Sequence, residues 1–298
     1  MKCVALIVTH NRLEKLKNTI KKSAGINFSS VVLVNNGSTD GTSRWLSACN
    51  EPRIIIINTE RNTGGAGGFR AGSEYICRHL KDTDWVFFYD DDAWPESNIL
   101  QAFSHLVTSG YHVFTSSVHT PEGIPCRMNL PFVKIPGKLK DTLIYLTAPG
   151  KYLLDPGKAT QVETVSFTGM VIRRDVLQEH LSDIHDEFFL YYDDLFFGYA
   201  LTKSGKSIRY SPELRFTHDI SIHNKIIHPE WKVYYLCRNL LLVGKVRHGV
   251  RIFGMPAIGL RLIRYLALFP WQRNKCHYLY CVIHGIIHGA IGIRGKKY

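Results

Sequence analysis

Three consecutive carboxylates follow a short apolar segment in the first third of the chain. Residues 85–89 are typical of a buried strand, and Asp90, Asp91 and Asp92 come directly after them. Open α/β sheets bind ligands at the carboxyl ends of their strands, where these carboxylates would lie. Three adjacent negative charges are costly without a cation, and such oxygen ligands suit Mg²⁺ or Mn²⁺ shared with substrate phosphates. The alternative is an acidic turn in which Asp92 caps a helix.

A second acidic pair, Asp193 and Asp194, lies inside an aromatic run at residues 188–199. An aromatic wall that holds two carboxylates is an unusual solvated face. Burial and a neighbouring like charge would raise one carboxyl pKa, which is how a general base is tuned. Either acid could instead cap a helix, and that role is compatible with catalysis. His218 follows a strand-like segment, and its imidazole could complete a carboxylate metal site, although a lone histidine is more often structural.

Two loops rich in small polar residues follow two other strand candidates. Residues 35–42 read NNGSTDGT, which suits either ligand contact through short side chains or simple turn chemistry. Residues 61–70 read RNTGGAGGFR, with four glycines in five positions before a helix. Such a loop leaves backbone amides open to an anion, and Arg61 and Arg70 add positive charge beside it. The spacing is not GxGxxG, and the loop follows the third strand, which disfavours a dinucleotide-binding fold.

Alternating strand-like and helix-like segments would position these groups. Strands are expected at residues 3–8, 31–34, 53–57 and 85–89, and helices at residues 13–22, 41–49 and 68–80. This order predicts an α/β fold with a mostly parallel sheet flanked by helices. Six prolines break residues 119–163 into loops and short elements, which we assign to acceptor recognition over a plain surface excursion. Further strands are expected at residues 164–173, 208–210 and 215–218, and helices at residues 175–179 and 188–204.

The composition describes a globular protein with a sizeable core: 298 residues, 45% hydrophobic and 21% charged. A net charge of +12 implies an anionic partner such as nucleotide phosphates, nucleic acid or an acidic membrane surface. No nucleic-acid-binding signature is present, and the acidic cluster would repel phosphate without metal, so we expect no nucleic-acid partner. Seven scattered cysteines without a CxxC pair signal free thiols in the cytoplasm. We expect neither a signal peptide nor a membrane span.

The last fifty residues are basic and apolar at once. Residues 247–298 hold nine Lys or Arg and no acid, interleaved with aromatic and aliphatic residues. This composition predicts a helical tail that lies on an anionic membrane surface without crossing it. The alternative is a helical appendage packed on the catalytic domain or on a second copy of the chain, as in a homo-oligomer.

Together these motifs resemble the inverting family 2 glycosyltransferases of the GT-A fold. The motifs THNR at residues 9–12, NGSTDGT at 36–42, RNTGG at 61–65, DDD at 90–92, DD at 193–194 and His218 fall in that family's order. The glycine-rich loop, the triple aspartate and WKVYYLCRN at residues 231–239 look most like the galactofuranosyltransferase branch. The resemblance implies a Rossmann-like catalytic domain at 1–230, with a nucleotide-sugar half at 1–118 and an acceptor half at 119–230. Residues 231–298 would form the helical C-terminal region.

The resemblance also implies a role for each matching residue. Asp92 and His218 would bind Mn²⁺ or Mg²⁺, and Asp194 of the Asp193–Asp194 pair would be the catalytic base. The nucleotide sugar would be bound by Thr9, Asn11, Arg12, Asn36, Ser38, Arg61, Gly64, Gly65, Asp90 and Asp91. Many relatives carry Asp where Asn36 stands, but an amide can still pair with a uracil edge.

The reaction implied is inverting transfer of galactofuranose from UDP-galactofuranose onto a glycan acceptor, lipid-linked, in bacterial O-antigen or capsule synthesis. The enzyme would act as a peripheral protein on the inner face of the cytoplasmic membrane. One alternative is a rhamnosyltransferase that uses dTDP-rhamnose, since such relatives share much of the scaffold. A non-catalytic glycan-binding relative is a second alternative, which the retained Asp92, Asp194 and His218 disfavour.

Overall fold

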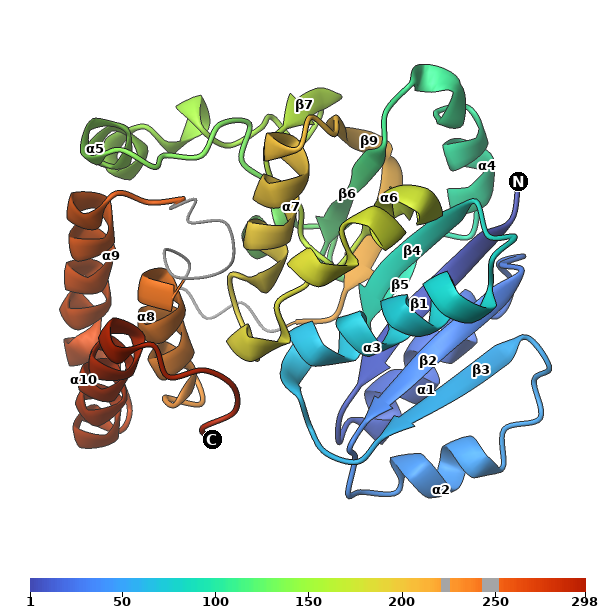
Figure 1. The fold of residues 1–298 in the computed structure, drawn as a ribbon, viewed down its shortest axis with the longest axis horizontal. Coiled ribbons are helices and arrows are strands. Elements are labelled where there is room, and N and C mark those ends of the chain that lie inside the picture. The colour runs from blue at the N-terminus through green and yellow to red at the C-terminus, as the bar shows by residue number, and fades with distance from the viewer. Residues whose placement is uncertain (221–225, 243–251) are drawn as a thin grey trace.

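A computed structural model describes residues 1–220, 226–242 and 252–298 (Figure 1). In this part of the chain nine strands form one sheet, in the order β3-β2-β1-β4-β8-β6-β9-β5, with β7 beside β9. The strands are β1 (Cys3–Thr9), β2 (Ser30–Asn36), β3 (Ile54–Thr59), β4 (Trp85–Asp90), β5 (Ala93–Pro95), β6 (Val113–His119), β7 (Thr160–Val162), β8 (Met170–Arg173) and β9 (Ile208–His218). The first four are parallel, and β8 runs antiparallel between β4 and β6.

Helices cover both faces of this sheet, as the sequence predicts. The helices are α1 (Leu13–Ser23), α2 (Thr42–Ser47), α3 (Gly64–His79), α4 (Ile99–Ser104), α5 (Leu139–Thr147), α6 (Arg174–Glu179), α7 (Asp193–Lys203), α8 (Lys232–Leu242), α9 (Met255–Ala267) and α10 (Lys275–Ile291). Alternate residues of β1 point to opposite faces. Leu6 packs in the core beneath α3, α6 and α7, whereas Ile7 packs in the core beneath α1, α2 and α4.

The sequence placed β1 to β4 and the helices α1, α2 and α3 to within four residues at either end, but it was wrong in three other places. Residues 164–169 are not part of a strand, because Gly169 at φ +86° interrupts the extended backbone before β8. The two short strands expected near residues 208–218 are the single strand β9. The helix expected from residue 188 begins only at Asp193, because positive φ angles at Phe189, Tyr191 and Tyr192 prevent helical backbone there.

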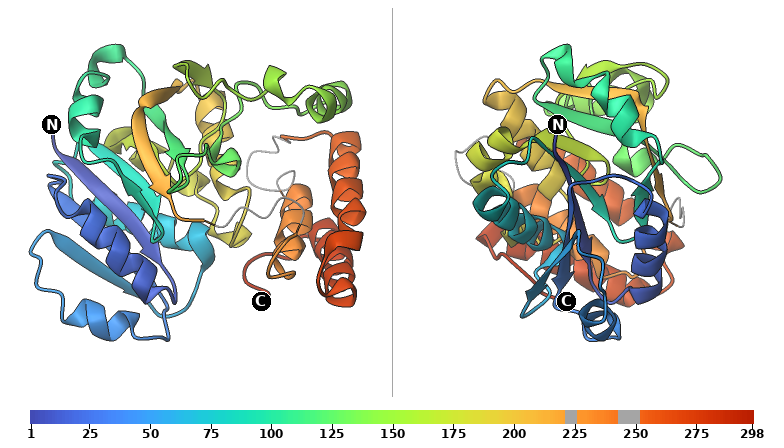
Figure 2. Two further views of the ribbon diagram at one scale, coloured as in Figure 1. Left: turned by 180° about the vertical axis from the view of Figure 1, so that it is seen from behind. Right: turned by 90° about the vertical axis from the view of Figure 1, so that its right-hand side faces the viewer.

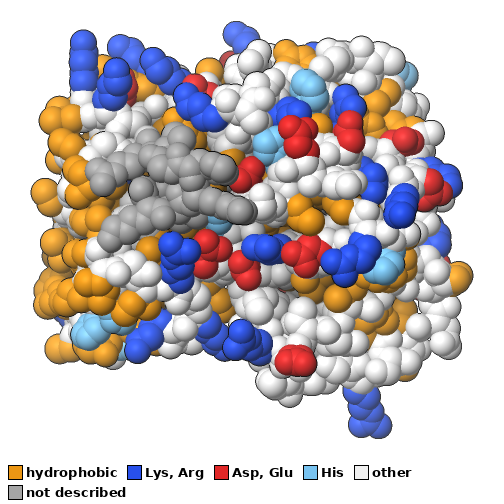
Figure 3. All heavy atoms as spheres, viewed as in Figure 1, with side chains coloured by type: hydrophobic (Ala, Val, Ile, Leu, Met, Phe, Trp, Pro, Cys, Tyr) orange, Lys and Arg blue, Asp and Glu red, His pale blue; other side chains and the backbone are white. Residues whose placement is uncertain are grey.

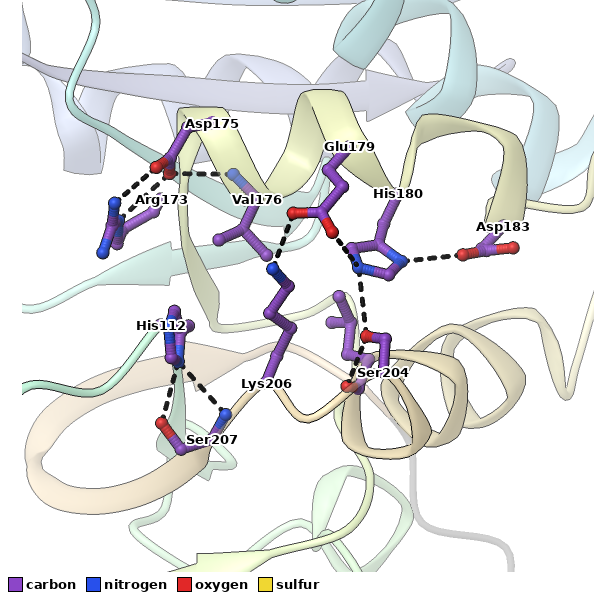
Figure 4. Close-up of polar contacts among 11 residues, drawn as sticks. His112, Arg173, Asp175, Val176, Glu179, His180, Asp183, Ser204, Lys206 and Ser207 are labelled. Atoms are coloured by element: carbon purple, nitrogen blue, oxygen red, sulfur yellow. Dashed lines mark hydrogen bonds and ion pairs between the residues drawn. The ribbon is translucent and has the colours of Figure 1, made fainter.

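A polar network anchors the end of α7 that is farther from Asp193 (Figure 4). Ser204 follows the helix directly, and its Oγ lies 3.1 Å from Nε2 of His180. Nδ1 of His180 lies 2.8 Å from the carboxylate of Asp183. Lys206 donates to Glu179 of α6 at 2.6 Å. These contacts join α7 to α6 and to the turn before β9, so they fix the helix that carries the acidic pair.

The C-terminal helices stand beside the end of the sheet at which β1 finishes (Figures 1 and 2). α8 and α10 pack closely because Gly285 and Gly289 leave room for the backbone of α8; a Cβ at either position would lie 2.6 Å from a carbonyl oxygen of that helix. The predicted helical tail is therefore confirmed for the described residues, whereas Arg247 and Arg251 lie outside them. Over the described ranges, every helix is too short or too polar to cross a bilayer.

Candidate active site

The triple aspartate follows β4, and its middle member faces inward. Asp91 accepts a hydrogen bond from Oγ1 of Thr9 at 2.7 Å, and Nη1 of Arg12 lies 3.3 Å from its other oxygen. Burial raises the pKa of Asp91 to about 7, although the charge of Arg12 acts in the opposite direction. Asp91 as a whole residue is 3% exposed. Asp91 thus fastens the end of β1 to the end of β4, and its contacts turn it away from a ligand.

Asp92 and His218, both buried, form a second polar contact beside that of Asp91. Nε2 of His218 lies 3.2 Å from Oδ1 of Asp92, and Arg12 donates to Oδ2 of Asp92 at 2.7 Å. Burial opposes ionisation of Asp92, but the His218 hydrogen bond and the Arg12 charge hold its pKa below the ordinary value. Asp92 is followed by β5, which pairs Ala93 with His218, so the helix-capping alternative for Asp92 is excluded.

A chain of buried side chains leads from His218 to the second acidic pair. Nδ1 of His218 lies 3.1 Å from Oδ1 of Asn129, and Nδ2 of Asn129 donates to Oγ of Ser166 at 2.9 Å. The hydroxyl of Ser166 in turn donates to the carboxylate of Asp194. Because Asn129 uses its amide nitrogen on Ser166, its oxygen must accept from Nδ1 of His218. Nδ1 of His218 therefore carries a hydrogen, and Nε2 is the ring nitrogen that faces Asp92.

The acidic pair opens α7, with Asp193 buried and Asp194 half-buried. Asp194 also accepts a hydrogen bond from the backbone N–H of Leu195 at 2.7 Å. Burial raises the pKa of Asp194 to about 6, with the charge of Asp90 acting in the same direction and the Ser166 hydrogen bond opposing it. Burial and the charge of Asp194 raise the pKa of Asp193 well above its ordinary value. The pair therefore contains one carboxylate that ionises near neutrality and belongs to the polar chain.

Asp90 lies between the two acidic groups. Thr168 donates to its carboxylate at 2.5 Å. Burial, and then the charge of Asp92, raises its pKa, while the His218 and Arg12 charges oppose the shift. Its charge also contributes to the raised pKa of both Asp193 and Asp194. The structure thus brings Asp90, Asp92, His218 and Asp194 into one site, although the acidic pair lies about a hundred residues from the triple aspartate in the sequence.

The loops after β1 and β2 are held together at the same edge of the sheet. Oδ1 of Asn11 accepts from the backbone N–H of Thr39 at 2.7 Å, and Oγ of Ser38 accepts from the backbone N–H of Asn11 at 3.1 Å. Asn11 has φ +53° and is exposed, as is the Arg12 that follows it. These residues therefore line an open edge beside Asp92.

Asn36 is buried and supports the glycine-rich loop. Its Nδ2 donates to the carbonyl of Gly64 at 2.8 Å, and its Oδ1 accepts from both the backbone N–H and the hydroxyl of Thr63, at 3.1 and 2.9 Å. Thr59 also donates to the same oxygen at 3.2 Å. With these contacts the amide shapes the loop and has no free edge to offer a uracil, which departs from the role that the family resemblance implied.

The glycine-rich loop is the first turn of α3, four residues earlier than the sequence placed that helix. Gly64 packs closely against the backbone of Phe189: a Cβ at Gly64 would lie 1.9 Å from the carbonyl oxygen of Phe189. A Cβ built at Gly65 would have no described atom within 4 Å, so the backbone is open there. Arg61 is exposed next to it. Arg70 is paired with Glu74 and Asp186, at 3.0 and 3.1 Å, so its charge is not free for an anion, contrary to expectation.

Asp92 and His218 offer a small donor set for a divalent cation. Among the residues that the structure describes, no group of three or more His, Cys, Asp or Glu is arranged to hold a metal ion. One carboxylate oxygen and one imidazole nitrogen 3.2 Å apart nevertheless fit a cation that takes its remaining ligands from diphosphate oxygens and water. The tautomer that Asn129 imposes on His218 leaves Nε2 able to ligate.

Lys232, the first residue of α8, also reaches this site and was missed in the sequence. Burial lowers the pKa of its ammonium group; the Arg12 charge adds to this effect and the Asp92 charge opposes it. In the described ranges no carboxylate lies within ion-pair distance of Lys232. A lysine 140 residues after the triple aspartate carries no local signal, nor does Asn129, which ends a short 3₁₀ helix, or Ser166, which lies in an irregular segment. Only the fold brings the three to the site.

Residues 4–181 match the sequence pattern described as glycosyl transferase family 2. The chain belongs to that family. It is therefore a glycosyltransferase, and its α/β fold is confirmed as the GT-A type. The chain is 22% identical, over 98% of its length and 92% of the relative's, to the low-salt glycan biosynthesis hexosyltransferase Agl10 of Haloferax volcanii. It is 32% identical to the galactofuranosyltransferase GlfT1 of Mycobacterium tuberculosis, over 30% of this chain and 29% of that one.

Two solved structures share the fold. GalNAc-T7, crystallised with UDP, GalNAc and Mn²⁺, superposes with a TM-score of 0.52 at 11% identity, over 74% of this chain and 44% of that chain. TarS of S. aureus superposes with a TM-score of 0.52 at 17% identity, over 92% of this chain and 45% of that chain. The chain thus spans less than half the length of either protein. At such identities the likeness concerns the fold alone.

Proposed function

We propose that this protein is a metal-dependent, inverting glycosyltransferase in which Asp194 is the catalytic base. The observation that carries the proposal is the polar chain from Asp92 through His218, Asn129 and Ser166 to Asp194. It joins a group able to hold a cation to a half-buried carboxylate whose pKa is raised to about 6. A base with that pKa is ionised at neutral pH and still basic enough to accept a proton.

The nucleotide-sugar donor would lie along the carboxyl ends of β1, β2 and β4. Asn11, Arg12 and Ser38 line the exposed edge for the nucleoside, with Asp90 near the ribose. The diphosphate would face Arg61, the open backbone at Gly65 and the N-terminus of α3, where unpaired amides favour anions. Thr9, Asp91, Asn36 and Gly64 would act by shaping the pocket, since their polar groups or backbone are engaged within the protein.

Asp92 and His218 would hold the divalent cation, Mn²⁺ or Mg²⁺. The GT-A neighbour GalNAc-T7 was crystallised with Mn²⁺, which supports a metal in this fold. When bound, such an ion neutralises the charge that develops on the leaving diphosphate. The second oxygen of Asp92 is held by Arg12, so the orientation of the carboxylate is already fixed.

The transfer would be a single displacement. Asp194 removes the proton of the acceptor hydroxyl as its oxygen attacks the anomeric carbon. The bond from that carbon to the diphosphate oxygen breaks, and the nucleoside diphosphate leaves with the electron pair. Arg61 and the N-terminus of α3 would stabilise that developing charge. Because one attack occurs from the face opposite the leaving group, the anomeric configuration inverts.

Galactofuranose from UDP-galactofuranose is the donor sugar we propose, on the strength of the local similarity to GlfT1 and the sequence motifs. Incubation with Mn²⁺ and a panel of nucleotide sugars, with nucleotide release as the readout, tests this. UDP-galactofuranose should be turned over fastest, and EDTA should abolish release. Preference for dTDP-rhamnose would instead assign a rhamnosyltransferase, and full turnover in excess EDTA would contradict the metal.

The acceptor we propose is a lipid-linked glycan at the inner face of the cytoplasmic membrane, in bacterial O-antigen or capsule synthesis. The name of Agl10 places that relative in glycan biosynthesis, which supports a glycan acceptor. One side of α10 exposes Tyr280, Ile283, Ile287 and Ile291, which recur at helical spacing. Orange side chains accordingly gather along the edge of Figure 3 that α9 and α10 occupy. The residues that follow α10 add the cations Arg294, Lys296 and Lys297.

A further inference from the structure

The short segment just before the acidic pair has an unusual backbone. Phe189, Tyr191 and Tyr192 all have positive φ angles, of 64°, 68° and 68°. Side chains other than glycine rarely adopt this region, and three instances within four residues are a concentration of strain. Phe189 has ψ −55°, and the N–H of Leu190 bonds to the carbonyl of Phe188 at 2.7 Å. That geometry is a γ-turn of the rare, strained hand.

Two neighbouring side chains of α8 hold the carbonyls of this segment. Nη2 of Arg238 donates to the carbonyl of Phe188 at 2.7 Å, and Nδ2 of Asn239 donates to the carbonyls of Leu190 and Tyr191 at 2.7 and 2.9 Å. Asn239 also reaches the carbonyl of Phe188 at 3.1 Å. The carbonyl that closes the γ-turn is therefore held by both side chains.

Arg238 directs its donors to backbone carbonyls and to Asn239. Arg238 is fully buried, and within the described residues no carboxylate pairs with it. Its Nε donates to Oδ1 of Asn239 at 2.8 Å, which orients the amide, and its guanidinium lies over the rings of Tyr234 and Tyr235. A buried charge without a counter-ion is unfavourable unless its donors are satisfied, and here backbone carbonyls satisfy them.

The opposite side of the segment rests on the glycine-rich loop. The carbonyl oxygen of Phe189 occupies the space that a Cβ at Gly64 would need. The ring of Phe189 stacks on the ring of Tyr235 of α8, with the ring centroids 5.0 Å apart. Residues 187–192 therefore lie between the N-terminus of α3 and α8, and Figure 1 shows these two helices on either side of the turn that precedes α7.

We propose that Arg238 and Asn239 are positioning residues for catalysis: they hold the strained segment in the one conformation that presents Asp194 to the acceptor. The inference rests on the proposed role of Asp194 as base. Release of the carbonyls lets Phe189, Tyr191 and Tyr192 return to negative φ, and that change displaces the residues that follow them. The helices after residue 230 are then part of the catalytic apparatus and not only an appendage.

The competing account is that the pair merely fastens the C-terminal region, since Nη1 of Arg238 also donates to the carbonyl of Gly295. Asn274 provides a matched control. It caps α10, and its Oδ1 accepts from the backbone N–H of His277 at 3.0 Å without touching residues 187–192. Asn274→Ala removes a backbone hydrogen bond in the same region but leaves the strained segment alone.

The test compares Asn239→Ala and Arg238→Lys with Asn274→Ala in the full-length protein. Amide hydrogen exchange is measured peptide by peptide, UDP affinity is measured with Mn²⁺, and kcat is measured with the best donor of the panel. In Asn239→Ala, exchange should rise selectively in residues 187–194 while α10 stays protected. The kcat should fall by about 10–100-fold, as for a misplaced catalytic group, with UDP affinity unchanged. The kcat of Arg238→Lys should lie between that of Asn239→Ala and that of the unmodified protein, since the lysine ammonium can still donate to a backbone carbonyl.

Two results would overturn the proposal. One is wild-type kcat in Asn239→Ala despite faster exchange in residues 187–194. The other is a uniform rise in exchange across α8 and α10 with parallel losses in Asn274→Ala, which assigns the pair a structural role. If the unmodified protein transfers no sugar from any donor, the proposed function fails on its own, and the exchange measurement still decides whether the pair holds the segment.

Discussion

Asn129 donates through Nδ2 to Oγ of Ser166 at 2.9 Å, and this contact joins the two halves of the site. On one side, Oδ1 of Asn129 receives the Nδ1 hydrogen of His218; on the other, Ser166 donates to Asp194. Each donor has one acceptor, so the orientation of every member follows from its neighbours. The cation-binding group and the base are thus set by one buried network.

This network makes the pH dependence of transfer predictable. Burial favours the protonated form of Asp194 and raises its pKa to about 6, whereas a base must be ionised to act. The kcat should therefore fall as the pH is lowered through about 6. The Ser166 hydrogen bond stabilises the ionised form, so Ser166→Ala should move this acid limb to higher pH. A kcat profile of both proteins checks this; an unshifted limb in Ser166→Ala would separate Ser166 from the base.

Gly64 should tolerate no side chain. A Cβ there would meet the carbonyl oxygen of Phe189 at 1.9 Å, and its φ of +77° is unfavourable for alanine. We expect Gly64→Ala to lower the free energy of unfolding by about 1–3 kcal/mol or more and to reduce transfer. Gly65→Ala is the control, because nothing described lies within 4 Å of the new methyl group. Equal urea midpoints for the two variants would contradict the close contact.

Lys232 should contribute to binding of the donor diphosphate. Lys232 is half-buried, and its ammonium lies near Asp92 and Arg12 without a carboxylate of its own among the described residues. Lys232→Met keeps most of the length of the side chain and removes the charge. We expect UDP affinity with Mn²⁺ to fall by about tenfold, the scale of one charged hydrogen bond, while uridine affinity stays the same. Calorimetry with both ligands checks this, and an equal loss for uridine would point to a distorted pocket instead.

The exposed face of α10 should bind anionic membranes. Ile283→Gln combined with Ile287→Gln removes apolar side chains that are 45% and 48% exposed. The unmodified protein should sediment with anionic but not neutral vesicles, less so at high salt. The double variant should stay in the supernatant, whereas Ile124→Gln, an exposed residue outside the C-terminal helices, should behave as the unmodified protein. Equal recovery of all proteins from both vesicle types would leave α10 as a packing or dimerisation element.

The sequence was informative where local pattern and structure coincide. The apolar run before Asp90 favoured a buried strand with the carboxylates at its end, and the aromatic run indicated an environment that raises a carboxyl pKa, as found for Asp194. The backbone of residues 188–192 could not be foreseen, because its positive φ angles come from contacts with α8 and not from glycine. Asn129 ends a short 3₁₀ helix and Ser166 lies in an irregular segment 37 residues later, and only the tertiary fold aligns them.

The role of Asp194 is tested most directly by Asp194→Asn beside Asp193→Asn. The amide is nearly the same size as the carboxylate, so UDP binding with Mn²⁺ should persist in both variants. Sugar transfer in Asp194→Asn should fall by about 10²–10⁴-fold, the usual contribution of a positioned base. Transfer in Asp193→Asn should fall far less. Wild-type transfer by Asp194→Asn, together with a large loss in Asp193→Asn, would contradict the assignment and move the base to the neighbouring residue.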